Sequence, residues 1–81
     1  MYHICFYEEG VFVTRLGDPV RSLSRALEQI ERLSAGTGAE KLDDYVGVKW
    51  LRAGSTTCHI IVADDFGEFI QTAALSEQED L

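Results

Sequence analysis

The sequence predicts an α+β domain: a single antiparallel sheet of about five strands with one helix packed on one face, in the order ββαβββ. Three observations support this fold class. The 81 residues leave room for one hydrophobic core. Hydrophobic residues make up 46% of the chain, which favours a globular over a disordered protein. Apolar residues recur at helical spacing in one segment, and strand-like runs lie before and after it. The domain is expected to cover residues 1–75, with an acidic tail at residues 76–81.

A β-hairpin is expected from His3 to Leu16, with its turn at Glu8-Glu9-Gly10. A two-residue loop at Glu9-Gly10 pairs Phe6 with Val13 and Tyr7 with Phe12. This register separates the side chains into two faces: Ile4, Phe6, Val11 and Val13 on one, and His3, Cys5, Tyr7, Phe12 and Leu16 on the other.

A helix follows the hairpin. Asp18-Pro19 is a helix-start signal, with aspartate as the N-cap and proline at the first helical position. Gly36 is the expected helix stop. Six apolar residues between them form one stripe at helical spacing: Val20, Leu23, Ala26, Leu27, Ile30 and Leu33. Beyond the helix, Thr37-Gly38-Ala39-Glu40 matches a capping box and allows one further helical turn.

The strand pattern returns from Tyr45 onward. Three alternating sets predict three strands: Val46, Val48 and Trp50; Cys58, Ile60 and Val62; Phe69, Gln71 and Ala73. A three-residue loop at residues 53–55 puts the first two sets on the same face, because side-chain direction alternates with a period of two. A four-residue loop at residues 64–67 adds Phe69 and Ala73 to that face. The polar residues from Ser76 onward are expected to fray.

Charge narrows the range of functions. Fourteen acidic residues oppose seven basic ones, so the formal charge is −7. Binding to phosphates requires a basic surface, so we expect no direct contact with nucleic acid or with an anionic membrane. An acidic surface complements a basic one, and their attraction raises the association rate. The alternative interpretation is that the charge only keeps a small protein soluble.

The sequence features that report on cellular location point to the cytoplasm. The N-terminus has no signal-peptide pattern, and no apolar run approaches the ~20 residues that span a bilayer. Two cysteines, Cys5 and Cys58, are too few for a disulfide scaffold. We therefore expect a cytoplasmic protein; an intermolecular disulfide through either thiol is left open.

The residue types that carry catalysis or bind metals are few. The soft metal ligands are His3, Cys5, Cys58 and His59. Cys58 and His59 are adjacent and point to opposite faces of a strand, and no metal-binding spacing occurs. No P-loop, nucleophile elbow or dinucleotide fingerprint occurs either. Acidic surroundings raise the pKa of a thiol and weaken it as a nucleophile. We expect no catalytic site, no metal and no cofactor.

The acidic residues form the candidate partner-binding site. Seven of them fall in predicted loops and strand ends: Glu8, Glu9, Asp43, Asp44, Asp64, Asp65 and Glu68. The predicted helix is near neutral, so negative charge gathers in the loops and the tail. At an interface, each carboxylate would act as a phosphate-like acceptor for lysine or arginine. Turns are also commonly acidic for local reasons, and both interpretations stay open.

Exposed apolar surface is a second indication of a partner. One helix covers only part of a five-stranded sheet, so an uncovered face remains. Some of six large side chains are expected on it: Tyr2, Tyr7, Phe12, Tyr45, Leu51 and Phe66. Aromatic residues are enriched at interaction hot spots, so a patch there would suggest a dimer or a protein target. Packing of the loops and the tail over this face is the alternative.

Two resemblances suggest kinds of partner. The hairpin segment Glu8-Glu9-Gly10-Val11-Phe12-Val13 followed by Ser22-Leu23-Ser24-Arg25-Ala26-Leu27 resembles the partial RNase-H-like domain of HicB antitoxins. That resemblance covers about half the chain and implies a protein that neutralises a small basic toxin. We expect no counterpart of the family's C-terminal DNA-binding module, and the family's segment between strand and helix is shortened to Leu16-Gly17-Asp18-Pro19.

In size, acidity and compact α+β pattern, the chain is also similar to phage-encoded anti-CRISPR proteins. That likeness, which is one of composition, implies an inhibitor that blocks the nucleic-acid contacts of a CRISPR effector complex. The leading hypothesis is therefore a non-enzymatic acidic inhibitor that docks on a basic, nucleic-acid-handling protein. The alternatives are a HicB-like antitoxin and a homo-oligomeric structural protein, with a homodimer as its simplest form.

Overall fold

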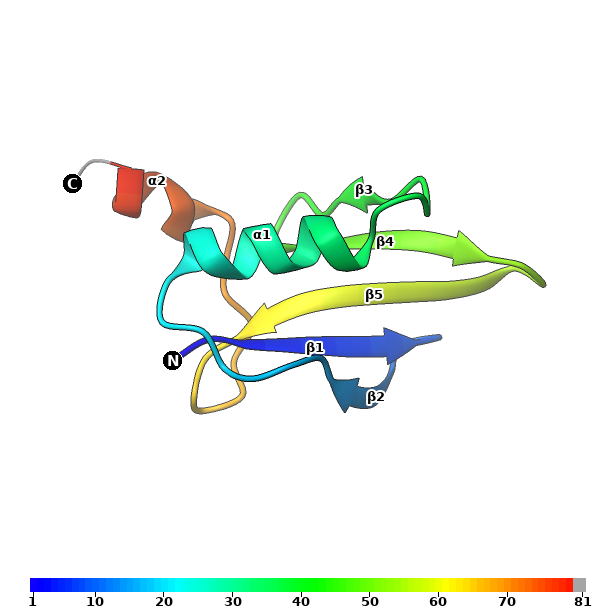
Figure 1. Ribbon diagram of the computed structural model, residues 1–81, viewed down its shortest axis with the longest axis horizontal. Helices are drawn as coiled ribbons and strands as arrows, with labels where there is room; N and C mark the ends of the chain where they lie inside the picture. Colours follow the sequence, from blue (N-terminus) through cyan, green and yellow to red (C-terminus); the bar gives the residue numbers. More distant parts are fainter. Residues whose placement is uncertain (80–81) are drawn as a thin grey trace.

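The computed structural model describes residues 1–79 of the chain. Within them, five strands and two helices follow in the order β1 (His3–Glu8), β2 (Val11–Arg15), α1 (Leu23–Leu33), β3 (Glu40–Lys41), β4 (Gly47–Arg52), β5 (Thr56–Ala63) and α2 (Ala73–Glu79). The strands form one antiparallel sheet in the order β2-β1-β5-β4-β3 (Figure 1). The predicted α+β class, with one antiparallel sheet and a helix on one face, is confirmed.

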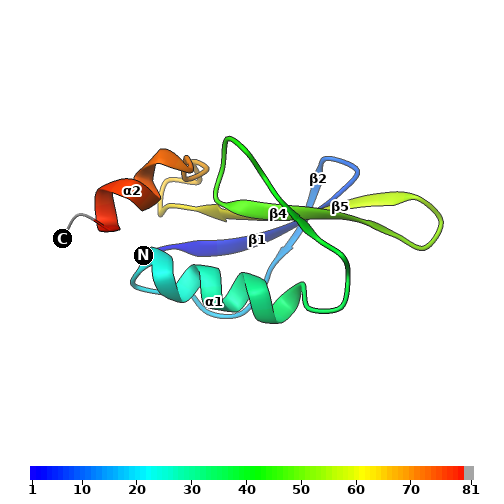
Figure 2. The ribbon, with the colours of Figure 1, turned by 90° about the horizontal axis from the view of Figure 1, so that it is seen from above.

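The two faces of the sheet have different coverings. Helix α1 lies across one face, which we call the helix face, and the segment that follows β5 lies on the opposite side (Figure 2). We call that opposite side the open face. Because side chains alternate along a strand, the even-numbered residues of β1, β4 and β5 point to the helix face and the odd-numbered ones to the open face.

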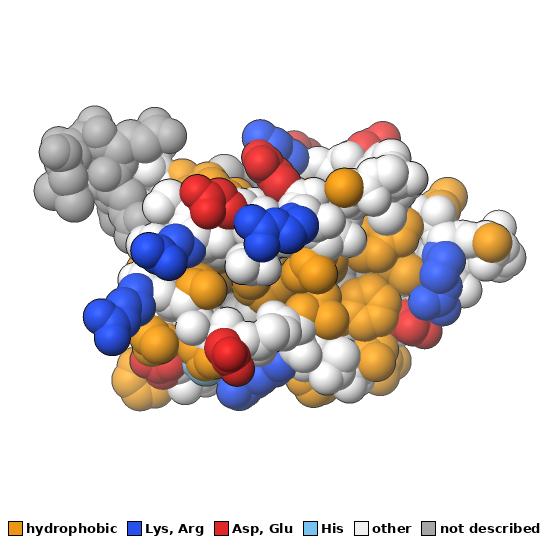
Figure 3. Space-filling view, in the orientation of Figure 1, with side chains coloured by type: hydrophobic (Ala, Val, Ile, Leu, Met, Phe, Trp, Pro, Cys, Tyr) orange, Lys and Arg blue, Asp and Glu red, His pale blue; other side chains and the backbone are white. Residues whose placement is uncertain are grey.

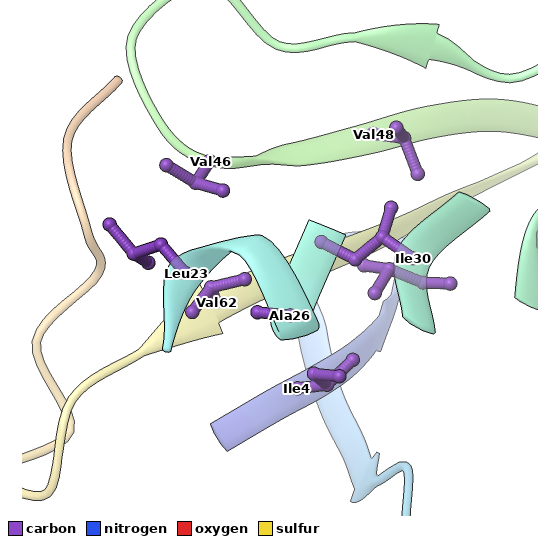
Figure 4. Packing of buried hydrophobic residues seen from close by; sticks show 8 residues of the cluster. Ile4, Leu23, Ala26, Ile30, Val46, Val48 and Val62 are labelled. Carbon is purple, nitrogen blue, oxygen red and sulfur yellow. The ribbon is translucent and has the colours of Figure 1, made fainter. Parts of the chain in front are cut away.

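The hydrophobic core lies between α1 and the helix face. Leu23, Ala26 and Ile30 point from α1 toward the strands, where they meet five buried residues: Ile4, Val46, Val48, Ile60 and Val62 (Figure 4). The three helical positions are spaced three and four residues apart, so they fall on one side of the helix. The apolar stripe predicted from the sequence therefore contains the residues that build the core.

The helix begins later than the sequence predicted. Its N-cap is Ser22, whose Oγ accepts a hydrogen bond from the backbone N–H of Arg25 at 3.2 Å. Asp18 as the N-cap is wrong because Val20 is held in an extended bridge to Tyr2, with N···O distances of 2.7 and 2.9 Å. The helix ends at Leu33, with Ser34 as its C-cap, two residues before the predicted stop.

The further helical turn after Gly36 is also wrong. The Thr37 hydroxyl donates to the Ser34 carbonyl at 2.6 Å and accepts from the N–H of Ala39 at 3.2 Å. Thr37 therefore closes the end of the preceding helix instead of opening a new one. Glu40 enters strand β3, where it pairs with Lys49.

The hairpin has the predicted loop but a different register. Residues 9 and 10 connect β1 to β2, and Tyr7 pairs with Phe12 as expected. Phe6 pairs with Thr14 and not with Val13, because a β-bulge makes Val13 an extra residue in β2. The bulge also changes the face of the residues beyond it. Leu16 therefore packs against the core on the helix face, contrary to the prediction.

Strands β4 and β5 agree with the prediction. The three-residue loop between them puts Val48 opposite Ile60 and Trp50 opposite Cys58. The expected strand at residues 69–73 is wrong. Phe69 and Gln71 make only isolated bridges, to Ala63 and Tyr45, and Ala73 begins α2. The place of this expected strand in the five-stranded sheet is taken by β3, which pairs with β4.

Phe69 also lies on the other face from the one predicted, because its bridge partner Ala63 belongs to the open face. The predicted tail has a helical backbone from Ser76 to Glu79, within α2, and its last two residues, 80 and 81, lie outside the described part of the chain.

Candidate protein-binding surface

The seven predicted site residues divide between the two ends of the sheet. Glu8 and Glu9 lie at one end, where β1 leads into β2. The other end is where β5 stops, since Ala63 pairs with His3 and Ile61 pairs with Gly47, the first residue of β4. Five carboxylates flank the strands there, and we call this the acidic end: Asp43, Asp44, Asp64, Asp65 and Glu68.

Glu8 and Glu9 are engaged within the chain. Arg52 donates two hydrogen bonds to Glu8, from Nη1 at 3.0 Å and from Nη2 at 3.2 Å. These bonds lower the pKa of the Glu8 carboxyl. Glu9 Oε1 accepts a hydrogen bond from the backbone N–H of Thr57 at 2.8 Å. Glu8 therefore ties the end of β1 to the end of β4, and Glu9 ties the hairpin loop to β5.

Asp64 builds the turn that follows β5. Its Oδ1 accepts hydrogen bonds from the N–H groups of Phe66, at 2.8 Å, and Glu68, at 3.0 Å. The Asp64 N–H also donates to the Glu68 carbonyl at 2.9 Å, and the Asp64 carbonyl accepts from the Gly67 N–H at 3.1 Å. This is the local role that acidic residues commonly take in turns.

Asp65 is the centre of a small charged cluster. Its Oδ1 lies 2.8 Å from His3 Nε2, and its Oδ2 accepts a hydrogen bond from the Met1 amine at 3.0 Å. On the other side of the ring, Arg15 Nη1 lies 3.3 Å from His3 Nδ1. Because a guanidinium can only donate, Nδ1 is the acceptor and Nε2–H donates to Asp65. The hydrogen bond from His3, followed by that from the amine, lowers the pKa of the Asp65 carboxyl.

The lowered pKa predicts a pH dependence of stability. The folded state prefers ionised Asp65, so its contribution is present above the ordinary pKa of 3.8 and is lost as pH falls through the lowered folded value. Asp65→Asn should therefore flatten the decline in unfolding free energy below about pH 4, as measured by urea titrations at several pH values. Asp43→Asn is the matched control, and an equal flattening in both variants would contradict the assignment.

Three carboxylates at the acidic end have no side-chain partner among the described residues: Asp43, Asp44 and Glu68. Asp43 and Asp44 line a shallow hollow together with Tyr45 and Thr72, next to the start of α2. The Thr72 hydroxyl is buried and has no hydrogen-bond partner in the described part of the chain. The hollow therefore presents two unpaired carboxylates and an aromatic ring, with a buried, unsatisfied hydroxyl beneath them.

A row of aromatic rings crosses the open face and ends at this hollow. Phe12 contacts Tyr7 with ring centroids 5.7 Å apart, and Phe69 lies 5.6 Å from both Tyr7 and Tyr45. We call these four residues the aromatic row. All three contacts are edge-to-face, and the rings of Phe12, Tyr45 and Phe69 remain exposed. The row thus joins exposed apolar surface to the unpaired carboxylates beside Tyr45 and Phe69.

The sequence predicted part of this surface. Tyr7, Phe12 and Tyr45 lie on the open face as expected, as does the exposed Leu51. Tyr2 is not part of this surface, because its bridge to Val20 places it against the core. Phe66 is at the tip of the turn rather than on the sheet. Phe69 was missed, and its place beside Glu68 after a tight turn is the signal that could have found it.

The helix face is also incompletely covered. Eleven residues make α1 roughly 16 Å long, whereas the eight residues of β5 extend roughly 26 Å. Hydrophobic side chains accordingly show over the strands beyond the end of α1 (Figure 3). Phe6 and Trp50 stack there with ring centroids 6.2 Å apart.

The candidate metal ligands do not converge. Cys58 is fully buried on the helix face, while His3, Cys5 and His59 belong to the open face. Among residues 1–79, no three histidine, cysteine or acidic side chains come together as a metal site. The pKa of the Cys5 thiol is raised, as predicted, but the main cause is burial and not nearby acidic groups.

Comparison with known proteins adds no relative. The chain matches no protein-family model, and no curated protein or solved structure is detectably similar to it. The resemblances to HicB antitoxins and anti-CRISPR proteins therefore stay predictions from the sequence. In the described part of the chain, no helix has the length and apolar character needed to cross a bilayer.

Proposed function

We propose that this protein is a non-enzymatic inhibitor that docks on a basic surface of a cytoplasmic, nucleic-acid-handling protein. A CRISPR effector complex blocked by an anti-CRISPR protein is the leading example. The observation that carries the proposal is the hollow at the acidic end, where Asp43 and Asp44 are unpaired beside Tyr45 and Thr72. Glu68, also unpaired, flanks Phe69 in the aromatic row.

The chemistry of this surface suits arginine and lysine. Carboxylates accept paired hydrogen bonds from a guanidinium, and aromatic rings attract the same group through cation–π contact. The net charge of −7 would draw a basic partner toward the surface and raise the association rate. A partner that binds nucleic acid presents such side chains in its phosphate-binding groove.

The proposal assigns different roles to the seven predicted residues. Asp43, Asp44 and Glu68 would contact the partner directly, since no described residue uses their carboxylates. The other four, Glu8, Glu9, Asp64 and Asp65, already hold hydrogen bonds within the chain. Those four would keep these hydrogen bonds and contribute only their negative charge to the attraction of the partner.

The first experiment is a tagged pull-down from host lysate at low salt and at about 0.5 M salt, with mass spectrometry of the captured proteins. We expect a nucleic-acid-handling complex that is retained at low salt and released at high salt. Capture of one small basic protein would instead favour the antitoxin alternative. A captured complex that resists high salt would contradict docking through carboxylates.

A further inference from the structure

The side chain of Phe66, which we call the knob, projects from the fold almost without packing. Phe66 is 91% exposed, more than any other large hydrophobic side chain among the described residues. The rings of the aromatic row contact one another, but Phe66 has no ring contact in the described part of the chain. Its side chain therefore contributes almost nothing to the stability of the monomer.

The backbone holds this knob in a defined position. The N–H of Phe66 donates a hydrogen bond to Asp64 Oδ1, and the N–H of Gly67 donates one to the Asp64 carbonyl at 3.1 Å. Gly67 has φ of +81°, a conformation that glycine adopts without strain. Asp65 ties the same turn to His3 and the Met1 amine. Because the turn is already ordered, burying the ring in a partner would cost little conformational entropy.

A hollow of matching chemistry lies next to the knob. It is lined by Met1, Pro19 and Val20, with two arginines, Arg21 and Arg25, at its side. Neither arginine forms a salt bridge with a described residue. Basic and hydrophobic side chains lie side by side at this end of the molecule, near the start of α1 (Figure 3). The knob, in contrast, is flanked by Asp64, Asp65 and Glu68.

We infer that two copies of this chain form a symmetric dimer, in which Phe66 of each copy enters the Met1–Pro19–Val20 hollow of the other. The charges around the knob and the hollow are opposite, so Glu68 of one copy would meet Arg25 of the other. The two features are neighbours at one end of the molecule, since Asp65 contacts Met1, which lines the hollow. A twofold axis between them therefore makes both contacts at once, as a self-complementary interface requires.

The contact area is small, so the dimer should be weak. Stable interfaces bury about 800 Å² on each partner, and one ring with its flanking residues supplies less. We expect a dissociation constant in the micromolar range or above, which sedimentation equilibrium from about 10 µM to 1 mM can measure. This inference shares Glu68 with the proposed function but needs no other protein, so sedimentation of the purified chain tests it separately.

The test uses variants that leave the fold unchanged. Phe66→Ala should weaken the dimer at least about thirtyfold, as loss of a hot-spot residue does. Leu51→Ala, which truncates another exposed side chain on β4 outside the proposed interface, is the control and should have no effect. A wild-type protein that is monomeric throughout this range, or a dimer that Phe66→Ala does not weaken, would overturn the inference.

Charge reversal gives a second, more specific readout. Arg25→Glu and Glu68→Lys should each be monomeric alone, since each places like charges around both the knob and the hollow. An equimolar mixture should dimerise again, because each variant then presents the charge that the other requires. A mixture that stays monomeric while wild type dimerises would show that these two residues do not meet.

Discussion

Gly47→Ala is expected to lower the free energy of unfolding by about 3 kcal/mol or more, because the sheet has no space for a side chain at this position. A Cβ atom on Gly47 would lie 2.3 Å from the carbonyl oxygen of Ile60 and 3.0 Å from the Cα of Ile61. Both are backbone atoms of β5, so neither can rotate away. To admit the methyl group, β4 would have to move away from the strand on which it packs.

The matched control is Gly54→Ala. Gly54 lies in the loop between β4 and β5, and nothing lies within 4 Å of its Cβ position, but its φ is +87°. Alanine there should cost about 1 kcal/mol through backbone strain alone. Urea titrations of both variants measure the two losses. If Gly47→Ala lowers the free energy of unfolding no more than Gly54→Ala does, β4 and β5 do not approach each other as closely at Gly47 as the structure shows.

The second large effect is expected from Ile30→Ala, at about 2–5 kcal/mol. Ile30 is 2% exposed and packs among the core residues of β4 and β5, so truncation leaves a cavity. Alanine has a higher helix propensity than isoleucine, so the change in propensity would offset part of the lost unfolding free energy. The loss itself would therefore come from the cavity. A domain of this size has a total stability of only about 4–12 kcal/mol, so the variant should be visibly destabilised.

Leu33→Ala is the control for this prediction. Leu33 ends the same helix but is 43% exposed, and its truncation should cost less than about 1 kcal/mol. Thermal and urea unfolding followed by circular dichroism compare the two variants. Equal losses would mean that α1 does not pack on the sheet through the face assigned here.

The sequence predicted the elements whose burial follows a simple period. Leu23, Ala26 and Ile30 repeat at helical spacing, and Val48 and Ile60 alternate along strands, so pattern alone identified the core. The helix start could not be found in this way. Asp18-Pro19 is a strong local signal, but the bridge between Tyr2 and Val20 joins residues far apart in the sequence and overrides it.

The region after β5 was missed for a related reason. Its alternating residues predicted a strand that continues the helix-face pattern. The turn held by Asp64 instead brings Phe69 opposite Ala63, which moves the ring to the open face. β3 has only two residues and thus no period to detect.

The sequence predicted which acidic residues belong to the candidate site but not which of them are free to bind a partner. Acidic loops are visible in the sequence, whereas the partners that engage them are distant. Arg52 lies 44 positions from Glu8, and His3 lies 62 positions from Asp65. Only the folded chain separates these engaged carboxylates from the unpaired Asp43, Asp44 and Glu68.

The proposal that carboxylates in the hollow bind a basic partner is tested most directly by one comparison of affinities. The dissociation constant of the captured partner is measured for wild type, for Asp43→Asn with Asp44→Asn, and for Glu28→Gln with Glu40→Gln. The two double variants remove the same charge, but the glutamates, on α1 and β3, do not line the hollow. We expect at least tenfold weaker binding for the aspartate pair, about 1.4 kcal/mol, and little change for the glutamate pair. Equal losses in both variants, or no loss in either, would contradict binding through these carboxylates.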